Sequence, residues 1–403
     1  FVVLGGVNLY RTADFSASTP TWTRIGGYAS PTTYASYTNH HADQHSGFFR
    51  PGSSVIYYSG HDGGLTKTLD VTAGSVSWST LNNGYTTSQF YTLAIEHSTS
   101  GNNVVGGGLQ DNGTWWTNST SSTVSWVDLF GGDGGFCAVS NSRTYYYVEA
   151  QWNSTANSVP MYRLTLDAGG NWVTAAYIEH LGSGYSLFIN PFVLDPNNTN
   201  MMYMVGGDRI WRNSDLTAIP NNNQSRTSQN WTAMTATAVT ANPITAIGVS
   251  KTPANRVYFG NNNGDMYSIE GANSGNPVPT DITGSLFPFG YMSCIAVNPS
   301  NGNQALVAFS NYVSRSLFWT TDSGTTWTDV GGNLEQNTDG TGNGPSVRWA
   351  AIVPTTQGTT YFVATSVGVY STTTLNASTV WTQEGSTTIG NVVTDMIDYR
   401  TSD

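Results

Sequence analysis

The side chains best able to do chemistry are imidazoles and carboxylates, and they gather early in this sequence. His41, Asp43 and His45 occupy alternate positions, and His61 and Asp62 follow. On an extended backbone alternate side chains point to the same face, so we expect His41, Asp43 and His45 to face one way. Such a set suits a transition-metal ion, contact with a ligand, or polar lining of a channel. We expect no metal and no cofactor.

More acids, amides and one aromatic ring continue this set into the next hundred residues. They are Gln89, Gln110, Asp111, Asp133, Glu149 and Trp152. Glycoside hydrolysis usually needs two carboxyl groups about 5–10 Å apart, one with a raised pKa. If the chain is an enzyme, Asp62, Asp111 and Asp133 are the candidate carboxyl groups. If it only binds a ligand, we expect contacts from His41, Asp43, His45, His61, Gln89, Gln110, Glu149 and Trp152.

The composition predicts an all-β protein with many tight turns. Charged residues are only 10% of the 403 residues, aromatic residues reach 12%, and there are 44 glycines. This mixture is typical of short strands joined by turns. The net charge of −11 argues against a nucleic-acid partner. No apolar run approaches the ~20 residues that a membrane-spanning helix needs, so we expect no membrane insertion.

One pattern recurs about every fifty residues: three apolar strands, then a Ser/Thr-rich stretch that ends at Trp. The third strands are expected near Tyr10, Leu65, Trp115, Tyr162, Trp211, Tyr267, Phe318 and Tyr370. Four short strands per repeat of this length indicate a β-propeller. We therefore predict a single propeller over residues 1–403, of about eight four-stranded blades, with seven as the alternative.

The repeats are expected near residues 1–38, 39–86, 87–130, 131–180, 181–240, 241–285, 286–345 and 346–403. The first repeat lacks its innermost strand, and residues 392–398 read as an extra strand. This strand either closes the ring with residues 1–10 or begins a missing blade. We expect the chain to be a fragment of a longer secreted protein.

Two stretches share the spacing Thr-x-Asp-x-Gly-x-x-Trp. One holds Asp167 and Trp172, and the other holds Asp322 and Trp327. A short carboxylate can accept backbone N–H bonds in a turn, Gly permits a positive φ, and Trp packs between sheets. We expect these four residues to be structural. The turns between second and third strands then lie at the opposite end of the channel, where the candidate site is expected.

These two stretches match the Asp-box, and the chain resembles the Asp-box propellers of sialidase-like, sortilin-like and xyloglucanase-like proteins. It is most similar to large Asp-box proteins exported by type IX secretion. That likeness rests on His41-Ala-Asp43-Gln-His45, His61-Asp62-Gly-Gly, Gly107-Gly-Leu-Gln110-Asp111-Asn112-Gly113, Gly131-Gly-Asp133-Gly-Gly and Met396-Ile-Asp-Tyr-Arg400. The resemblance implies a secreted or cell-surface protein. It also makes Asp62 the closest analogue of the catalytic Asp of xyloglucanase-like propellers, and so implies Asp62 as the base of an enzyme, with Asp111 or Asp133 as its partner.

Cys137 and Cys294 are expected in the innermost strands of the fourth and seventh repeats. Three blades apart, their Cα atoms would exceed the ~7 Å limit for a disulfide. We predict two free, buried thiols.

Three functions remain open at this stage. The first is an extracellular or cell-surface propeller that binds carbohydrate or a glycosylated surface, with polysaccharide or glycoprotein as the partner. The second is a glycoside hydrolase of xyloglucanase-like type. The third is a structural subunit of an extracellular filament or assembly, in which the partner is a second copy or another domain of the same polypeptide. A propeller can host any of the three.

Overall fold

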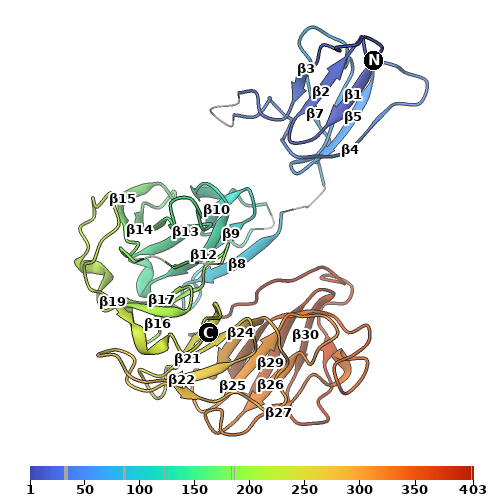
Figure 1. Cartoon of the computed structure of the whole chain (residues 1–403). Helices are drawn as coiled ribbons and strands as arrows, with labels where there is room; N and C mark the ends of the chain where they lie inside the picture. Colours follow the sequence, from blue (N-terminus) through green and yellow to red (C-terminus); the bar gives the residue numbers. More distant parts are fainter. Residues whose placement is uncertain (31–34, 85–87, 122, 183, 186, 401) are drawn as a thin grey trace. The chain divides into compact units, whose positions relative to one another are not determined.

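The computed structural model describes residues 1–403 except 31–34, 85–87, 122, 183, 186 and 401. The described chain is all-β, as predicted, and its strands form antiparallel sheets (Figure 1). It divides into two compact units, Phe1–Ser88 and Gln89–Asp403, which we call the N-terminal and C-terminal units. The expected boundary at residues 86 and 87 lies outside the described residues. That the units together make one domain stays a prediction.

The N-terminal unit holds two sheets. The first has three strands: β1 (Val2–Gly5), β2 (Leu9–Thr12) and β3 (Thr23–Gly26). The second has four: β4 (Gln44–Phe49), β5 (Tyr57–His61), β6 (Gly64–Thr68) and β7 (Ser79–Thr80). Their core contains Leu9, Ile25, Tyr57, Val71 and Trp78. Among the described residues, the first sheet has one strand fewer than the second, in line with the first repeat.

The C-terminal unit holds six sheets of four strands each, in chain order. The first three sheets are β8 (Phe90–Ile95), β9 (Val105–Leu109), β10 (Gly113–Thr117), β11 (Val127–Phe130); β12 (Gly134–Val139), β13 (Tyr146–Ala150), β14 (Met161–Leu166), β15 (Trp172–Tyr177); and β16 (Phe192–Asp195), β17 (Asn198–Gly206), β18 (Arg209–Asn213), β19 (Trp231–Met234). The last three are β20 (Ile244–Val249), β21 (Val257–Asn261), β22 (Met266–Ile269), β23 (Thr280–Asp281); β24 (Met292–Val297), β25 (Ala305–Phe309), β26 (Leu317–Thr320), β27 (Thr328–Asp329); and β28 (Val347–Thr355), β29 (Gly358–Thr365), β30 (Gly368–Thr372), β31 (Thr382–Gln383).

The helical part of the described chain is small. Four 3-10 turns are present: Asn141–Arg143, Leu216–Ala218, Thr235–Thr237 and Gly332–Leu334. Among the described helices, none has the length and apolar character that crossing a membrane would require.

All eight predicted third strands are confirmed. Tyr10 lies in β2 of the sheet that lacks its first strand, and the other seven markers lie in β6, β10, β14, β18, β22, β26 and β30. Each of these strands pairs with the last strand of its own sheet. The aromatic or apolar residue at each marker therefore identified the strand correctly.

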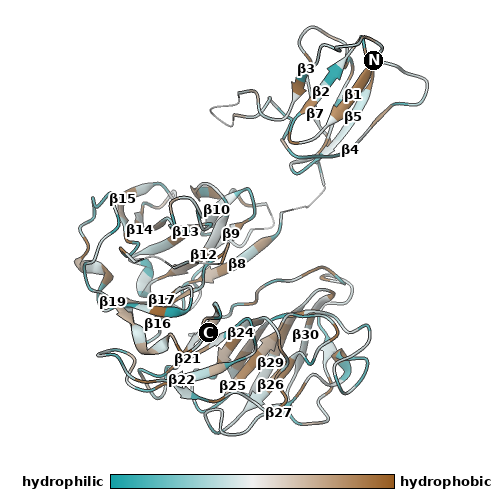
Figure 2. Ribbon diagram, in the orientation of Figure 1, coloured by the Kyte–Doolittle hydropathy of each residue, from teal (hydrophilic) through white to brown (hydrophobic). Residues whose placement is uncertain are grey.

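Hydrophobic side chains fill the space between successive sheets. One cluster joins Tyr203 of β17 to Phe259 of β21, and another joins Tyr258 of β21 to Phe318 of β26. Hydrophobic stretches lie on the strands, while many connecting loops are hydrophilic (Figure 2). The first strands of the six sheets in the C-terminal unit, β8, β12, β16, β20, β24 and β28, line a common cavity. We call them the inner strands.

Residues 391–400 form no strand, so the expected extra strand is not there. This segment instead contacts the inner strands β8 and β28, and also β29, the neighbour of β28. The amide of Thr394 donates to the carbonyl of Thr365 at the end of β29 (3.0 Å), and Asp395 accepts from Arg348 of β28. Met396 Sδ accepts from the amide of Leu93 in β8 (3.1 Å). The segment thereby links the last sheet of the C-terminal unit to the first.

Candidate functional site

The boxes at Asp167 and Asp322 show carboxylates used inside their own turns. Asp322 Oδ1 accepts from the amide of Thr326 (2.9 Å), and Asp167 Oδ1 accepts from the amides of Gly169 and Asn171 (2.8 and 2.9 Å). Side-chain hydrogen bonds, from Asn171 to Asp167 and from Thr326 to Asp322, and then these backbone bonds hold the pKa of each carboxyl below its usual value. Gly324 has a φ of +87°. The hydrogen bonds are those that a structural role requires.

The two box tryptophans differ. Trp327 donates its indole N–H to the carbonyl of Ile282, beside the last strand of the preceding sheet (2.8 Å). Trp78, Trp231 and Trp381 make the same kind of bond, to Ile25, Ile178 and Val330. Trp172 is 45% exposed and lies within 6.1 Å of the Tyr162 ring, measured between ring centroids. The indole N–H bonds of Trp78, Trp231, Trp327 and Trp381 therefore each connect a sheet to the preceding one.

In the N-terminal unit, the predicted row of His41, Asp43 and His45 does not form. Asp43 has a φ of +59°, and β4 begins only at the next residue. The backbone is bent through residues 42–43 rather than extended, so the alternation of side chains is lost. The prediction that the three face one way is wrong.

The most buried imidazoles in the N-terminal unit are His40 and His61. Their ring centroids lie 4.6 Å apart, and the His40 centroid lies 4.2 Å from that of Trp78. Burial lowers the pKa of His40 to about 3 and that of His61 to about 4, with neighbouring imidazoles adding to the effect. His40 Nδ1 accepts from the amide of Gly27 (3.0 Å). Both rings are therefore neutral parts of the core.

Asp62, the expected catalytic base, has its carboxylate bound to His45. Asp62 Oδ1 contacts His45 Nε2, and the His45 side chain is 68% exposed. His41 stacks at 6.3 Å from His61. In the part of the chain that the structure describes, no group of three or more His, Cys, Asp or Glu side chains is placed to hold a metal ion.

In the C-terminal unit, several predicted residues meet at the amino end of the inner strands, around Tyr91. The Tyr91 hydroxyl donates to Gln110 Oε1 (2.6 Å). Burial raises the pKa of Tyr91, and the nearby carboxylates of Asp133, Asp111 and Asp395 raise it further. Two polar residues of the turn after β9, one of the link before β12 and one of the C-terminal segment thus surround a single hydroxyl.

Hydrogen bonds hold this group in place. Asp133 Oδ1 accepts from the amide of Asp111 (2.9 Å), and the Asp133 amide donates to Gln151 Oε1 (3.0 Å). Gln89 Nε2 donates to Asp395 Oδ2 (2.5 Å). Asp133 is buried, whereas Gln89 and Gln110 are exposed. We call Gln89, Tyr91, Gln110, Asp111, Asp133 and Asp395 the polar cluster.

Glu149 and Trp152 do not join the polar cluster. Glu149 is fully buried in β13, where Oε1 accepts from the amide of Phe136 (2.9 Å). Burial raises the pKa of Glu149 well above its usual value. Trp152 packs against the hydrophobic cluster that contains Tyr185 and Phe192. Glu149 is therefore not available to a ligand at the surface, whereas Trp152 is only partly buried and its contact role stays a prediction.

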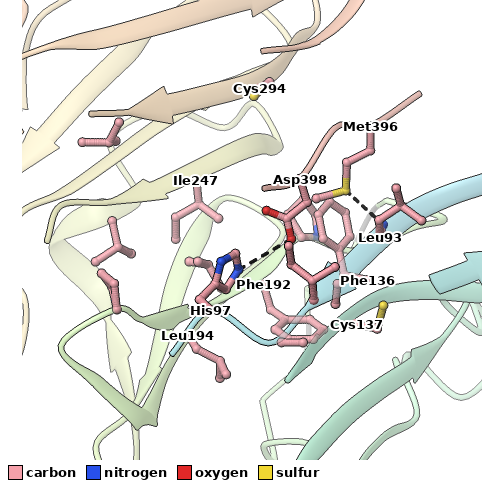
Figure 3. Close-up of a pocket in the computed structure, with 18 of the residues that line it drawn as sticks. Leu93, His97, Phe136, Cys137, Phe192, Leu194, Ile247, Cys294, Met396 and Asp398 are labelled. Atoms are coloured by element: carbon pink, nitrogen blue, oxygen red, sulfur yellow. Dashed lines mark hydrogen bonds and ion pairs between the residues drawn. The ribbon is translucent and has the colours of Figure 1, made fainter. Parts of the chain in front are cut away.

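The structure shows a second feature, a cavity of about 410 Å³ among the inner strands (Figure 3). Its lining runs along these strands, from residues near their amino ends such as Phe192 and Thr245 to residues beyond their carboxyl ends such as His97, Asn141 and Lys251. His97 Nε2 lies 3.6 Å from Asp398 Oδ2. Burial raises the pKa of Asp398, while His97 lowers it. His97, Lys251 and Asp398 lie at the end of the inner strands that carries the box turns, opposite to the expected site.

Sequence reasoning missed this cavity, because its lining is spread singly over six strands. A usable signal was present in the innermost strands, which place Cys137 and Cys294 among small and apolar residues. Both thiols are free, as predicted, although Cys137 is only partly buried in the folded chain. Both line the cavity, and burial raises the pKa of each thiol to about 12. Neither is a thiolate nucleophile at neutral pH.

The polar cluster can offer hydrogen bonds but not an evident acid–base pair. Among the candidate carboxyl groups, the one whose pKa is strongly raised is Glu149, which solvent does not reach. A general acid must touch the substrate oxygen that it protonates. No family model matches the chain, and no curated protein matches it either.

Proposed function

We propose that this chain is a secreted or cell-surface β-propeller that binds carbohydrate through the polar cluster. The observation that carries the proposal is the arrangement around Tyr91. Two exposed amide side chains, Gln89 and Gln110, stand beside carboxylates that are themselves held by hydrogen bonds. A pre-positioned set of donors and acceptors suits a ligand made of hydroxyl groups.

The chemistry of the cluster favours a neutral saccharide. Amides donate and accept, and carboxylates accept from hydroxyl groups. Three carboxylates, Asp111, Asp133 and Asp395, surround the Tyr91 hydroxyl, and Arg348 is bound to Asp395. The surplus of negative charge disfavours an anionic ligand such as a phosphate or a uronic acid. A neutral polysaccharide or the glycan of a glycoprotein fits best.

The fold belongs to the proposal as well. We propose that the sheets form a ring of the Asp-box propeller type, in one domain with the N-terminal sheets. Support comes from six inner strands around one cavity and from the C-terminal segment that links β8 to β28 and β29. Tryptophan N–H bonds between successive sheets add to this support.

A panel of neutral and acidic polysaccharides tests the proposal, scored both for retention of the protein and for release of reducing ends. We expect retention by a neutral polysaccharide without release. Gln110→Ala should weaken retention by about tenfold, because one amide pair to a sugar hydroxyl is worth about 1–1.5 kcal/mol. Gln357→Ala, an exposed Gln in the β28–β29 turn, is the matched control and should bind as the parent chain does.

Release of reducing ends would replace binding with hydrolysis. In that case Asp62→Asn, Asp111→Asn and Asp133→Asn would show which carboxylate acts. Retention by no polysaccharide, or retention equal in Gln110→Ala and Gln357→Ala, would contradict the proposal.

A further inference from the structure

The cavity among the inner strands is built to take an apolar body. Three aromatic rings lie on its amino side: Phe136 is 6.3 Å from Phe192 and 6.5 Å from Trp349, between centroids. They come from three different inner strands, β12, β16 and β28. Leu93, Ile247 and Met396 add aliphatic and thioether surface (Figure 3). A volume of about 410 Å³ falls within the range of small-molecule sites.

Charged groups are confined to the carboxyl end of the cavity. Asp398 faces His97 and accepts from the amide of Tyr399 (2.8 Å). Lys251 lines the same end, is exposed, and forms no ion pair with any residue that the structure describes. The cavity therefore has an apolar floor and a charged rim. At the rim the Asp398 carboxylate has an ion-pair partner, His97, whereas the Lys251 ammonium group has none among the described residues.

We propose that this cavity binds a small amphipathic organic acid, with its aromatic or aliphatic body on the floor and its anionic group at Lys251. A cationic ligand would meet Lys251 and His97. A sugar would leave its hydroxyl groups unpaired against Phe136, Phe192 and Trp349, which is costly. The charged rim lies at the other end of the inner strands from the polar cluster, and the proposed acid site does not depend on the carbohydrate proposal.

Two fluorescent probes of one shape test this inference on the whole chain. Anilinonaphthalene sulfonate carries an anionic group, and phenylnaphthylamine is its uncharged counterpart. We expect the sulfonate to bind more tightly. Lys251→Met should weaken binding of the sulfonate by about fivefold, the most that a solvated ion pair contributes. It should leave the affinity for the uncharged probe unchanged.

A substitution that fills the cavity should weaken the binding of both probes. Ile247→Trp places a larger ring in the cavity and should weaken each probe by about tenfold or more. Val278→Trp is the control, because Val278 is 81% exposed and does not line the cavity. The thiols give a reading on the unmodified chain at about pH 9, where a small ionised fraction of each thiol can react: saturating sulfonate should slow alkylation of Cys137 and Cys294 by iodoacetamide.

The inference is overturned if Ile247→Trp binds both probes as the parent does, or if the sulfonate leaves alkylation of both thiols unchanged. Equal affinities of the two probes, unaffected by Lys251→Met, would overturn the assignment of an acid. If Ile247→Trp does not fold, the alkylation result alone decides, because it needs no variant.

Discussion

At the scale of single residues, backbone conformation separates the candidates that meet from those that do not. The alternation of His41, Asp43 and His45 indicated a common face, but Asp43 has a φ of +59° and interrupts the extended chain. An Asp in this region costs little, which is why the sequence pattern could not reveal the bend. By contrast, Gln110, Asp111 and Asp133 were predicted together and do lie around one hydroxyl.

Residue burial also predicts a pH response of the N-terminal unit. In the unfolded chain His40 and His61 have pKa values near ~6.5. Folding lowers them to about 3 and about 4, so the unfolded state binds more protons below about pH 6.5. Stability is full above that pH and falls as the pH drops toward 4. At pH 5 the loss should be about 2 kcal/mol for each imidazole.

Hydrogen exchange of peptides from β4–β6, corrected for intrinsic rates, measures this response. The groups facing the His61 ring are His41 and His45, which lower its pKa, and Asp62, which raises it. At His40 the charge of His61 lowers the pKa, while a backbone hydrogen bond at His41 raises it. His61→Gln should flatten the pH dependence, and His41→Gln, at a less buried position, should keep it. Exchange that is unchanged between pH 7 and pH 5 would count against the buried neutral pair.

At the scale of elements, the sequence was most informative where the same pattern recurs from repeat to repeat. The third strands were all located, because an apolar strand before a Ser/Thr-rich turn recurs with nearly constant spacing. The segment at residues 392–398 looks equally strand-like, yet it forms no ladder. Met396 of this segment contacts β8 and lines the cavity instead, and local propensity does not distinguish these outcomes.

The tryptophan bonds between sheets give the element-scale prediction. Trp327→Phe removes the N–H that the carbonyl of Ile282 accepts and leaves that oxygen unpaired. We expect a loss of about 1–2 kcal/mol in the free energy of unfolding, measured by urea denaturation. Trp172→Phe is the control from the other complete box, since Trp172 is exposed, and should change stability by less than about 0.5 kcal/mol. Equal effects would show that the indole bond contributes nothing.

At the scale of the whole molecule, the C-terminal segment connects the ends of the C-terminal unit. Asp395 accepts from Gln89, just before β8, and from Arg348 in β28. Asp395→Asn should lower the urea midpoint and cost about 1–3 kcal/mol, because hydrogen bonds to a charged group are lost. Asp208→Asn, which removes an exposed pair with the adjacent Arg209, should cost under about 1 kcal/mol. A smaller effect at Asp395 than at Asp208 would argue against this connection.

The sequence predicted the polar cluster in part and missed the cavity, because residues far apart in the chain contribute to both. Gln89, Gln110, Asp111 and Asp133 lie near one another in the chain, so short-range pattern was enough. Asp395 enters from about 300 residues away, and the cavity takes its lining singly from six strands and the C-terminal segment. Only the arrangement of the sheets brings such residues together.

A crystal structure of the chain with a retained neutral oligosaccharide tests the central proposal most directly. The account predicts sugar density at the amino end of the inner strands, with hydroxyl groups within hydrogen-bond distance of Gln110 and a ring beside Tyr91. Sugar bound at the box turns, in the cavity or on the N-terminal unit would contradict it.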